Sequence, residues 1–540
     1  MATGKSPGLD GLPDEFYQRF CSLLGTYFVD VINFAYNHGQ FFPSQRSGVI
    51  TLIHKRGDRL DMKNWPPITL LCADYKIVAK AIANRLLGVI AKVTHSDQTC
   101  GVADRNSLES VRLLKDVVFH ANQNRKAAAI ISLDQENAYD RVEWGYLSRV
   151  LQTMNFGQSF QKWVLLLYSN ICSYILINGE TTEFFSVSPG VRQGYPLSPL
   201  LYVLVAETLA SAIRADRFID SYILPNGRSV KLCQYADDTS AIVTTDLALN
   251  ALFRHFHLFT RYEKASGAKL NVTKCHGLLI DTWQSRSNLP IALNWSNVEI
   301  IVLGSRISND NEEQWESRIK ASKTTLSAWN RKALSFRGRA LIANMLGLIT
   351  LWYLCSFSVI PEAIIKAVNG EIFPFVWRKK REWLARSSVT QRPNQGGLGV
   401  VDVHRKMLSL HVLWVKRLIF RSNLPWTSFF SQYLIRAFPG RSVHQILILA
   451  VPPKYSMDAF PPLYRSVMTA WFALERRFVD NEYVICGPRW SCLNSSRQVS
   501  SMTPCLTNIV SNIDASKSMR IGVFQSIGQI FGCPFFSGVS

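Results

Sequence analysis

The sequence has 540 residues, of which 47% are hydrophobic and dispersed along the chain, so it predicts several subdomains with buried cores and excludes a disordered protein. Its formal net charge of +21 and pI near 9.6 favour a polyanionic partner, either nucleic acid or an anionic membrane surface. Residues Met1 to Lys5 lack the apolar run of a secretory signal. We therefore expect an intracellular protein with reduced cysteines.

Strands and helices alternate irregularly through the first half of the chain. Short strands are predicted at Gly48–Leu52 and Ala128–Leu133. Apolar residues recur at three-to-four spacing in Ala73–Val93, which predicts an amphipathic helix. Further helices are predicted at Ser198–Ala215 and Leu252–Ala265, so the fold class is α/β.

The character of the sequence changes around Asp281–Asn294, which is polar, and long helical stretches follow it. Ser317–Arg339 carries seven basic residues and no acidic one, which is typical either of a solvated helix face or of a face that follows phosphates. A second break is predicted at Gln391–Gly399, where proline and glycines cannot sustain a helix. These changes predict three regions, 1–285, 286–390 and 391–540.

Two other kinds of site are weaker alternatives. Ala340–Ile360 contains no charged residue and is long enough to span a bilayer, but its polar residues favour a buried helix. Cys486, Cys492 and Cys505 have no histidines at zinc-finger spacing, and no CxxC pair occurs, so we expect no structural zinc.

The segment Tyr235–Ser240, which reads YADDTS, places two adjacent carboxylates between apolar runs. This pattern predicts a hairpin with Asp237 and Asp238 at its connection. Side chains that alternate across a regular strand can approach one ion at a turn. Two aspartates at a turn are nevertheless common, so the segment alone does not establish a site.

Asp134 ends the apolar strand at Ala128–Leu133 and should lie at its exposed carboxyl end. Mg²⁺ prefers oxygen ligands and is usually held by one or two carboxylates together with substrate phosphates. Asp134, Asp237 and Asp238 could supply such a set. Two cations roughly 3.5–4 Å apart would stabilise both the attacking and the leaving oxygen of a phosphoryl transfer.

Between these acidic segments lies SPGVRQGYPLSPLLYVL, whose glycines and prolines predict a loop leading into a helix. We expect Arg192 and Gln193 to be exposed on this loop, where they could line a nucleotide pocket together with Gly190 and Gly194. The three segments follow the order of motifs A, B and C of reverse transcriptases.

The chain resembles the reverse transcriptases of LINE-type non-LTR retrotransposons. The resemblance covers roughly residues 4–420 and rests on the blocks GKSPGLDGLPDEFY, VITLIHKRGD, NWPPITLLCADYKIVAKAIANRL, SLDQENAYDRVEW, GVRQGYPLSPLLY, YADDTS, GAKLNVTKC, GRALIANMLG, FVWRKK and GGLGVVDVHRKM. It implies a right-hand polymerase with fingers and an antiparallel-sheet palm at 1–285, a helical basic thumb at 286–390 and a mainly helical C-terminal region. The series starts at the first finger block, without the endonuclease of a full-length element.

The resemblance implies a role for each matching residue. Asp134 and Asp237 would bind two Mg²⁺ ions, for which Mn²⁺ could substitute, and Asp238 would support them. Tyr139 occupies the steric-gate position that excludes a ribose 2′-hydroxyl, although a core aromatic is the alternative. Gln193 and Gly194 match the nucleotide pocket.

Three sets of basic residues complete the implied site. Lys55 matches a residue near the triphosphate, and Lys274 matches one that could protonate pyrophosphate, although a solvated lysine is the alternative for both. The thumb residues expected to contact nucleic acid are Arg318, Lys320, Lys323, Arg331 and Lys332.

Several positions depart from the family pattern. Pro66 stands where the family usually has an arginine that grips the triphosphate, and proline supplies no charge or donor. Pro189, Tyr195 and Asp104 are milder differences, of the kind that a decaying element copy accumulates.

The sequence therefore predicts an RNA-directed DNA polymerase that uses an RNA template, a DNA primer and deoxynucleoside triphosphates. The alternative is a catalytically impaired descendant that binds RNA or RNA–DNA duplex, and a membrane-associated basic protein is a third class. We expect no membrane partner. The resemblance implies a nuclear location, with a cytoplasmic ribonucleoprotein as the alternative.

Overall fold

The computed structural model describes residues 3–55, 57–254, 256–289, 293–310, 313, 315–448, 457, 460–474, 476–479 and 482–485. The chain forms two compact units, each considered by itself. The first is built from the described parts of Met1–Ser110, His120–Tyr222 and Ser229–Asn309. The second is built from those of Val111–Phe119, Ile223–Arg228 and Asp310–Ser540.

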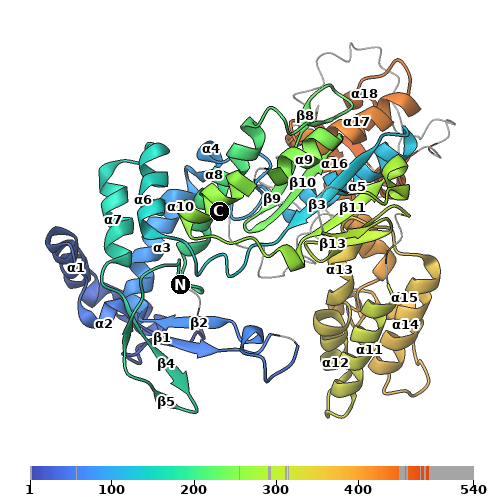
Figure 1. Cartoon of the computed structure of the whole chain (residues 1–540). Helices are drawn as coiled ribbons and strands as arrows, with labels where there is room; N and C mark the ends of the chain where they lie inside the picture. Colours follow the sequence, from blue (N-terminus) through green and yellow to red (C-terminus); the bar gives the residue numbers. More distant parts are fainter. Residues whose placement is uncertain are drawn as a thin grey trace. The chain divides into compact units, whose positions relative to one another are not determined.

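The first unit contains a five-stranded sheet with the order β12-β11-β3-β10-β9 (Figure 1). The pairs β11–β3, β3–β10 and β10–β9 are antiparallel, whereas the pair β12–β11 is parallel. Strand β3 is the middle strand of this order, and its residues are almost all buried, as expected of an apolar run covered on both faces. The bounds are β3 (Ala128–Leu133), β9 (Leu232–Tyr235), β10 (Asp238–Val243), β11 (His276–Ile280) and β12 (Asn294–Ser296).

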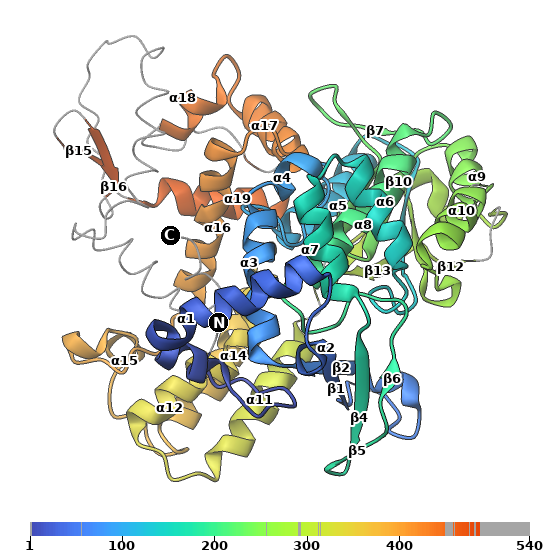
Figure 2. The same ribbon diagram turned by 90° about the vertical axis from the view of Figure 1, so that its left-hand side faces the viewer.

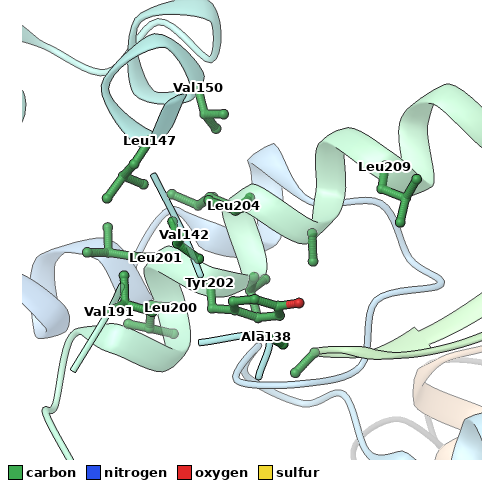
Figure 3. Close-up of a cluster of buried hydrophobic side chains, with 14 of the residues drawn as sticks. Ala138, Val142, Leu147, Val150, Val191, Leu200, Leu201, Tyr202, Leu204 and Leu209 are labelled. Atoms are coloured by element: carbon green, nitrogen blue, oxygen red, sulfur yellow. The ribbon is translucent and has the colours of Figure 1, made fainter. Parts of the chain in front are cut away.

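Helix α8 (Ser198–Ala215) has its predicted bounds and lies in the core of this unit. Its first turn contains a proline, at a position where a missing N–H costs no helical hydrogen bond. Figure 3 shows Leu201, Tyr202 and Leu204 of α8 in one cluster with Leu147 and Val150 of α6 (Trp144–Thr153). This buried cluster supports the loop that precedes α8 and the segment after β3.

A second sheet in the same unit has the order β2-β1-β4-β5, with β6 also paired to β4 (Figure 2). Strand β1 (Ser47–Leu52) is antiparallel to β2 (Pro67–Leu71) and parallel to β4 (Cys172–Ile177). Strand β1 confirms the prediction at Gly48–Leu52. The remaining bounds are β5 (Glu180–Thr181), β6 (Phe185–Ser186), β7 (Tyr222–Ile223), β8 (Ser229–Val230), β13 (Glu299–Val302) and β14 (Ser305–Ser308).

One predicted helix of the first half is divided, and a second is helical over its described residues. The segment Ala73–Val93 forms α3 (Ala73–Leu87) and α4 (Ile90–Val93), since the chain leaves the helix at Gly88. The segment Leu252–Ala265 spans the end of α9 (Asp246–Arg254) and most of α10 (Phe256–Ser266). The other helices are α1 (Asp14–His38), α2 (Pro43–Arg46), α5 (Ser107–Gln123) and α7 (Gln158–Tyr168).

The second unit is mainly helical in its described part. Its helices are α11 (Glu316–Asn330), α12 (Phe336–Ile342), α13 (Ile349–Cys355), α14 (Glu362–Val376), α15 (Arg386–Val389), α16 (Val403–Phe420), α17 (Pro425–Ala437), α18 (Val443–Ile448) and α19 (Pro462–Phe472). A short hairpin, β15 (Arg476–Val479) and β16 (Glu482–Ile485), follows. The fold class is therefore α/β with an antiparallel-sheet palm and a mainly helical second half, as predicted.

The apolar segment Ala340–Ile360 is not one helix. Helix α12 continues into a π-helical turn at Ala343–Gly347, and α13 follows at a bend of 44°. Considered together, the two pass a length and apolarity test for a membrane span, as does α8, of which 67% is buried. Core helices of soluble proteins pass the same test, so neither segment is assigned to a membrane. Cys486, Cys492 and Cys505 lie outside the described residues.

Candidate active site

The central sheet brings the two predicted acidic segments together. Asp134 directly follows β3, and Ala236 and Asp237 form the two-residue connection between β9 and β10. Leu133 pairs with Thr239 across β3 and β10. Asp134 follows Leu133 and Asp238 precedes Thr239, so the two carboxyl-bearing residues lie at the same end of this strand pair.

The electrostatics of the three carboxyl groups show that they interact. Partial burial, followed by the charges of Asp237 and Asp134, raises the pKa of Asp238 to about 6. Burial and the charge of Asp134 also raise the pKa of Asp237. Burial raises the pKa of Asp134 as well, while Lys274 and His276 lower it. The three groups thus repel one another in a partly dehydrated site.

Both predicted active-site lysines lie within electrostatic range of these carboxylates. The charge of Lys55 lowers the pKa of Asp237 and of Asp238, and the charge of Lys274 lowers that of Asp134. Lys55 is exposed just beyond β1, and Lys274 is exposed at the end of the 3-10 turn Val272–Lys274. Each lysine can therefore present its charge toward an anion beside the carboxylates.

Tyr139 lies next to the same carboxylates and is also partly packed into the core. Its ring stacks on Tyr202 with centroids 4.5 Å apart. Burial raises the pKa of the Tyr139 hydroxyl above its usual value, and the nearby charges of Cys100, Asp237 and Tyr235 add to this effect. The residue is thus both half-buried and close to the site, so its predicted gating role stays a prediction.

The loop before α8 packs closely against the segment after β3. Gly190 has φ +96°, and a Cβ there would lie 2.8 Å from the carbonyl oxygen of Asp140. The side-chain amide of Gln193 donates to both carboxylate oxygens of Asp140, at 3.1 and 3.2 Å. Gly194 is exposed, with φ +87°. Gln193 and Gly194 therefore lie on a loop whose position is fixed by the residues that follow Asp134.

The prediction that Arg192 is exposed on this loop is wrong. Its side chain is buried, with 7% exposure, and Nη2 donates to the carbonyl oxygens of Arg46 and Cys172 at 3.0 and 3.1 Å. A buried guanidinium that binds backbone carbonyls is held by the sheet that contains β1 and β4. Arg192 is therefore buried and bound to the backbone through Nη2, in place of the predicted exposed position.

Pro66 lies on the same hairpin as Lys55. Its carbonyl oxygen accepts a hydrogen bond from Ile53 N–H at 3.5 Å, one step beyond the Leu52–Pro67 pair of β1 and β2. The backbone N–H of Lys55 donates to Asn64 at 3.0 Å. An arginine at position 66 would thus stand close to Lys55.

The basic residues predicted to contact nucleic acid are only partly together on one helix. Lys320 and Lys323 are exposed on α11, Arg318 is half-buried there, and Lys323 pairs with Glu371 at 2.9 Å. Arg331 and Lys332 are exposed in the break between α11 and α12. Four of the five residues thus present charge to solvent in the second unit. This exposure fits a solvated face as well as a face that contacts phosphates.

Comparison with known proteins agrees with this geometry. The family model for reverse transcriptase (RNA-dependent DNA polymerase) matches residues 53–336, which is more than half of the chain and includes the three aspartates. The chain belongs to the reverse transcriptase family.

Its relatives place it among the non-LTR retrotransposon reverse transcriptases. It is 33% identical over 483 residues to the transposon TX1 uncharacterized 149 kDa protein of Xenopus laevis, covering 87% of this chain and 36% of the relative. It is 26% identical over 225 residues to a Pol polyprotein from the R2 element of Popillia japonica, covering 42% and 31%. A probable RNA-directed DNA polymerase from transposon X-element of Drosophila melanogaster is 27% identical over 223 residues, covering 39% and 23%. The chain thus spans about a third of the length of the first relatives it matches.

Solved structures similar to the chain include telomerases. The apo telomerase from Candida tropicalis is 14% identical with a TM-score of 0.41, covering 71% of this chain and 69% of that one. Telomerase from Candida albicans in complex with a fragment of telomeric RNA is 11% identical with a TM-score of 0.41, covering 81% and 69%.

Reverse transcriptases depend on metal ions, and the donor set at the carboxylates fits a divalent cation. Oxygen ligands whose ionised forms repel one another gain stability when a cation neutralises them. Within the described ranges, however, only Asp10, Cys72 and Asp74 have three ligand atoms that all lie within 4.8 Å of one another. Asp134, Asp237 and Asp238 are thus close enough to interact electrostatically but more widely spaced than that group.

Sequence reasoning missed several residues of this candidate site. Asp140 fixes Gln193, and the Sγ atom of Cys275 accepts a hydrogen bond from Asp134 N–H at 3.5 Å. His276 lowers the pKa of Asp134. Asp140 follows Tyr139 within a recognised block, so its position was visible in the sequence, but its partner was not.

Proposed function

We propose that this chain is an RNA-directed DNA polymerase that adds deoxynucleotides to a primer 3′-hydroxyl. The observation that carries the proposal is the adjacency of Asp134 and the Asp237–Asp238 turn in the central sheet of a member of the reverse transcriptase family. The registry of that sheet sets a partly buried acidic cluster at the end of β3. Such a cluster is what cation-assisted phosphoryl transfer requires.

Asp134 and Asp237 would hold two Mg²⁺ ions, or Mn²⁺ in their place, and Asp238 would add negative charge beside them. When bound, the ions neutralise charge that develops on the attacking and leaving oxygens. The raised pKa values of Asp237 and Asp238 support this assignment, because partly buried carboxylates that also repel one another are stabilised by a bound cation.

The side chains around the carboxylates would position the nucleotide. Lys55 would face its triphosphate, and Lys274 would donate a proton toward the leaving pyrophosphate. Tyr139 would exclude a ribose 2′-hydroxyl by steric contact. Gln193 and Gly194 would line the pocket from a loop held in place by Asp140. Electrostatic positioning of this kind supplies most of the catalysis expected in phosphoryl transfer.

An RNA template and a DNA primer are the partners that this activity needs. The charge of +21 supports a polyanionic partner, and exposed bases on α11 and after it would contact phosphates. In this proposal residues 1–285 form fingers and palm, 286–390 form the thumb, and 391–540 have no assigned role. The protein would work in the nucleus, where its DNA target lies.

A catalytically impaired, RNA-binding descendant is the second candidate. It is favoured by Pro66, which stands beside Lys55 without the charge or the donors of an arginine. In that case the basic surface would retain nucleic acid while nucleotide addition would be slow.

Primer extension on an RNA template separates the two candidates. The purified chain, Asp237→Ala and Pro66→Arg are compared with Mg²⁺ present and after chelation, and RNA binding is measured in parallel. DNA synthesis by the unaltered chain that is lost in Asp237→Ala and after chelation supports the polymerase. If the unaltered chain binds RNA without making DNA and Pro66→Arg restores DNA synthesis, the result supports the impaired descendant. If all three proteins bind RNA and none makes DNA, the result rejects the polymerase.

A further inference from the structure

The turn that carries Asp237 has a backbone conformation that its own residues do not favour. Ala236 has φ +53°, in the left-handed region that residues with a Cβ seldom adopt. Two-residue hairpin connections usually meet this demand with glycine or asparagine. The residue is only 4% exposed, so water cannot readily satisfy its N–H. The conformation must therefore be held by groups outside the hairpin ladder.

Gln98 supplies the missing acceptor. Its side chain is 0% exposed, and Oε1 accepts hydrogen bonds from Ala236 N–H at 3.1 Å and from Cys100 N–H at 2.9 Å. Its Nε2 donates to Oε1 of Gln234 at 2.9 Å. Because two N–H groups converge on the oxygen and an oxygen faces the nitrogen, the amide has one favourable orientation.

Gln234 extends this contact across the sheet. It is 1% exposed on β9, and its Nε2 donates to the hydroxyl oxygen of Thr239 at 3.0 Å. Thr239 is the cross-strand partner of Leu133, the residue before Asp134. The series Gln98–Gln234–Thr239 thus begins at Ala236, the residue before Asp237. It ends at the partner of Leu133, the residue before Asp134.

The backbone around Gln98 is also fixed to β9. Gln98 forms a parallel bridge with Gln234. The N–H of Thr99 donates to the carbonyl of Gln234, and the N–H of Gln234 donates to the carbonyl of Asp97, both at 2.9 Å. The Gln98 amide is therefore anchored from both sides and can act as a rigid support for the turn.

We propose that Gln98 is a positioning residue that holds the left-handed turn at Ala236 and thereby aims the Asp237 carboxylate at a cation shared with Asp134. Its effect on DNA synthesis rests on the proposed function, whereas its effect on the turn and on cation binding does not require synthesis. A purely structural role of Gln98 would stabilise the unit without a specific effect on the turn or on cation binding. No other acceptor for Ala236 N–H occurs among the hydrogen bonds of the described residues.

The test compares the unaltered chain with Gln98→Leu, which removes the acceptor and the donor, and Gln98→Glu, which keeps an acceptor for Ala236 N–H. Tyr222→Phe is the matched control, because it removes a buried hydrogen bond of 2.7 Å to His120 in the same unit. The readouts are hydrogen exchange of peptides covering 232–240 and Mn²⁺ affinity followed by electron paramagnetic resonance. Melting temperature, kcat and KM for deoxynucleotide are measured alongside.

In Gln98→Leu we expect exchange at the turn to rise and Mn²⁺ affinity to fall, each by about 10-fold, as is common when a residue that orients a metal ligand is lost. Gln98→Glu should retain most of the turn protection, and Tyr222→Phe should lower only the melting temperature. Unchanged turn exchange and Mn²⁺ affinity in Gln98→Leu, at a melting temperature like that of the control, would overturn the proposal. If the unaltered chain makes no DNA, the polymerase assignment fails, while turn exchange still decides the role of Gln98.

Discussion

The acidic residues of the site carry most of its expected response to pH. The pKa of Asp238 is about 6, raised first by burial and then by Asp237 and Asp134. Below that pH the carboxyl is increasingly neutral and attracts a cation less. We therefore expect Mn²⁺ affinity to be constant above about pH 7 and to fall steadily below about pH 6. Calorimetric titration between pH 5 and 8 measures this, and a flat profile would contradict the assignment.

The same burial and charge repulsion should cost stability when no cation is bound. The folded pKa of about 6 lies above the ordinary value of 3.8, so the ionised group destabilises the fold above about pH 6, and this cost disappears as the pH falls below about 4. Asp238→Asn should therefore raise the melting temperature by about 1–2 °C at pH 7.5 in chelator. At pH 4 the difference should vanish. An equal gain at both pH values would mean that the ionised Asp238 carboxylate is not the cause.

Pro66 offers a prediction about nucleotide affinity. A guanidinium beside Lys55 can bind a phosphate group with two parallel hydrogen bonds, so Pro66→Arg should lower KM for deoxynucleotide by about 10-fold. Pro67→Arg is the matched control, since consecutive residues of a strand face opposite sides of the sheet. Steady-state primer extension measures KM for deoxynucleotide in both variants. The same improvement in the control would show a general charge effect instead.

At the scale of elements, the loop before α8 depends on one glycine. Gly190→Ala adds a Cβ 2.8 Å from the Asp140 carbonyl oxygen in addition to the strain of φ +96°, so we expect a loss of about 3 kcal/mol in the free energy of unfolding. Gly179→Ala has a similar φ of +93° but no atom within 4 Å, and should cost only about 1 kcal/mol. Urea denaturation compares them. Equal losses would mean that the close approach to Asp140 is not tight.

Some of these elements could be predicted because local pattern and tertiary environment agree. Strand β3 and helix α8 have their predicted bounds, since a continuous apolar run suits a buried strand and a proline-started apolar run suits a core helix. The division of Ala340–Ile360 was not predicted, because a bend between packed helices depends on their neighbours. The same holds for Arg192, whose backbone partners are 146 and 20 residues away.

The residues of the candidate site show the same limit of prediction from sequence. Asp134, Asp237 and Asp238 stood out because an acidic residue at the end of an apolar run is unusual in so basic a chain. Gln98 and Gln234 are uncharged residues without a spacing pattern, and only the sheet register brings them together. Asp10, Cys72 and Asp74 likewise come from two finger blocks whose proximity the sequence does not display.

At the scale of the whole molecule, the net charge of +21 should appear as a salt dependence of RNA binding. If Lys320, Arg331 and Lys332 contact phosphates, replacing all three with alanine should reduce the slope of log affinity against log salt by about 2 to 3. A charge-matched control replaces Lys92, Arg149 and Lys264, which are exposed on helices of the first unit. Fluorescence anisotropy at several salt concentrations measures the slope. The same reduction in the control would favour the solvated-face interpretation for Lys320, Arg331 and Lys332.

The central claim is that residues 134 and 237 hold the same cations, and cleavage by bound iron tests it most directly. Fe²⁺ exchanged for Mg²⁺ reduces added hydrogen peroxide to hydroxyl radicals that cut the chain close to the metal, with ascorbate regenerating Fe²⁺. The fragments are mapped by mass spectrometry. We predict cuts near Asp134 and near Asp237–Asp238 that excess Mg²⁺ suppresses and that Asp237→Ala removes together. Cuts at only one of these segments, or cuts confined to the neighbourhood of Asp10, Cys72 and Asp74, would contradict the account.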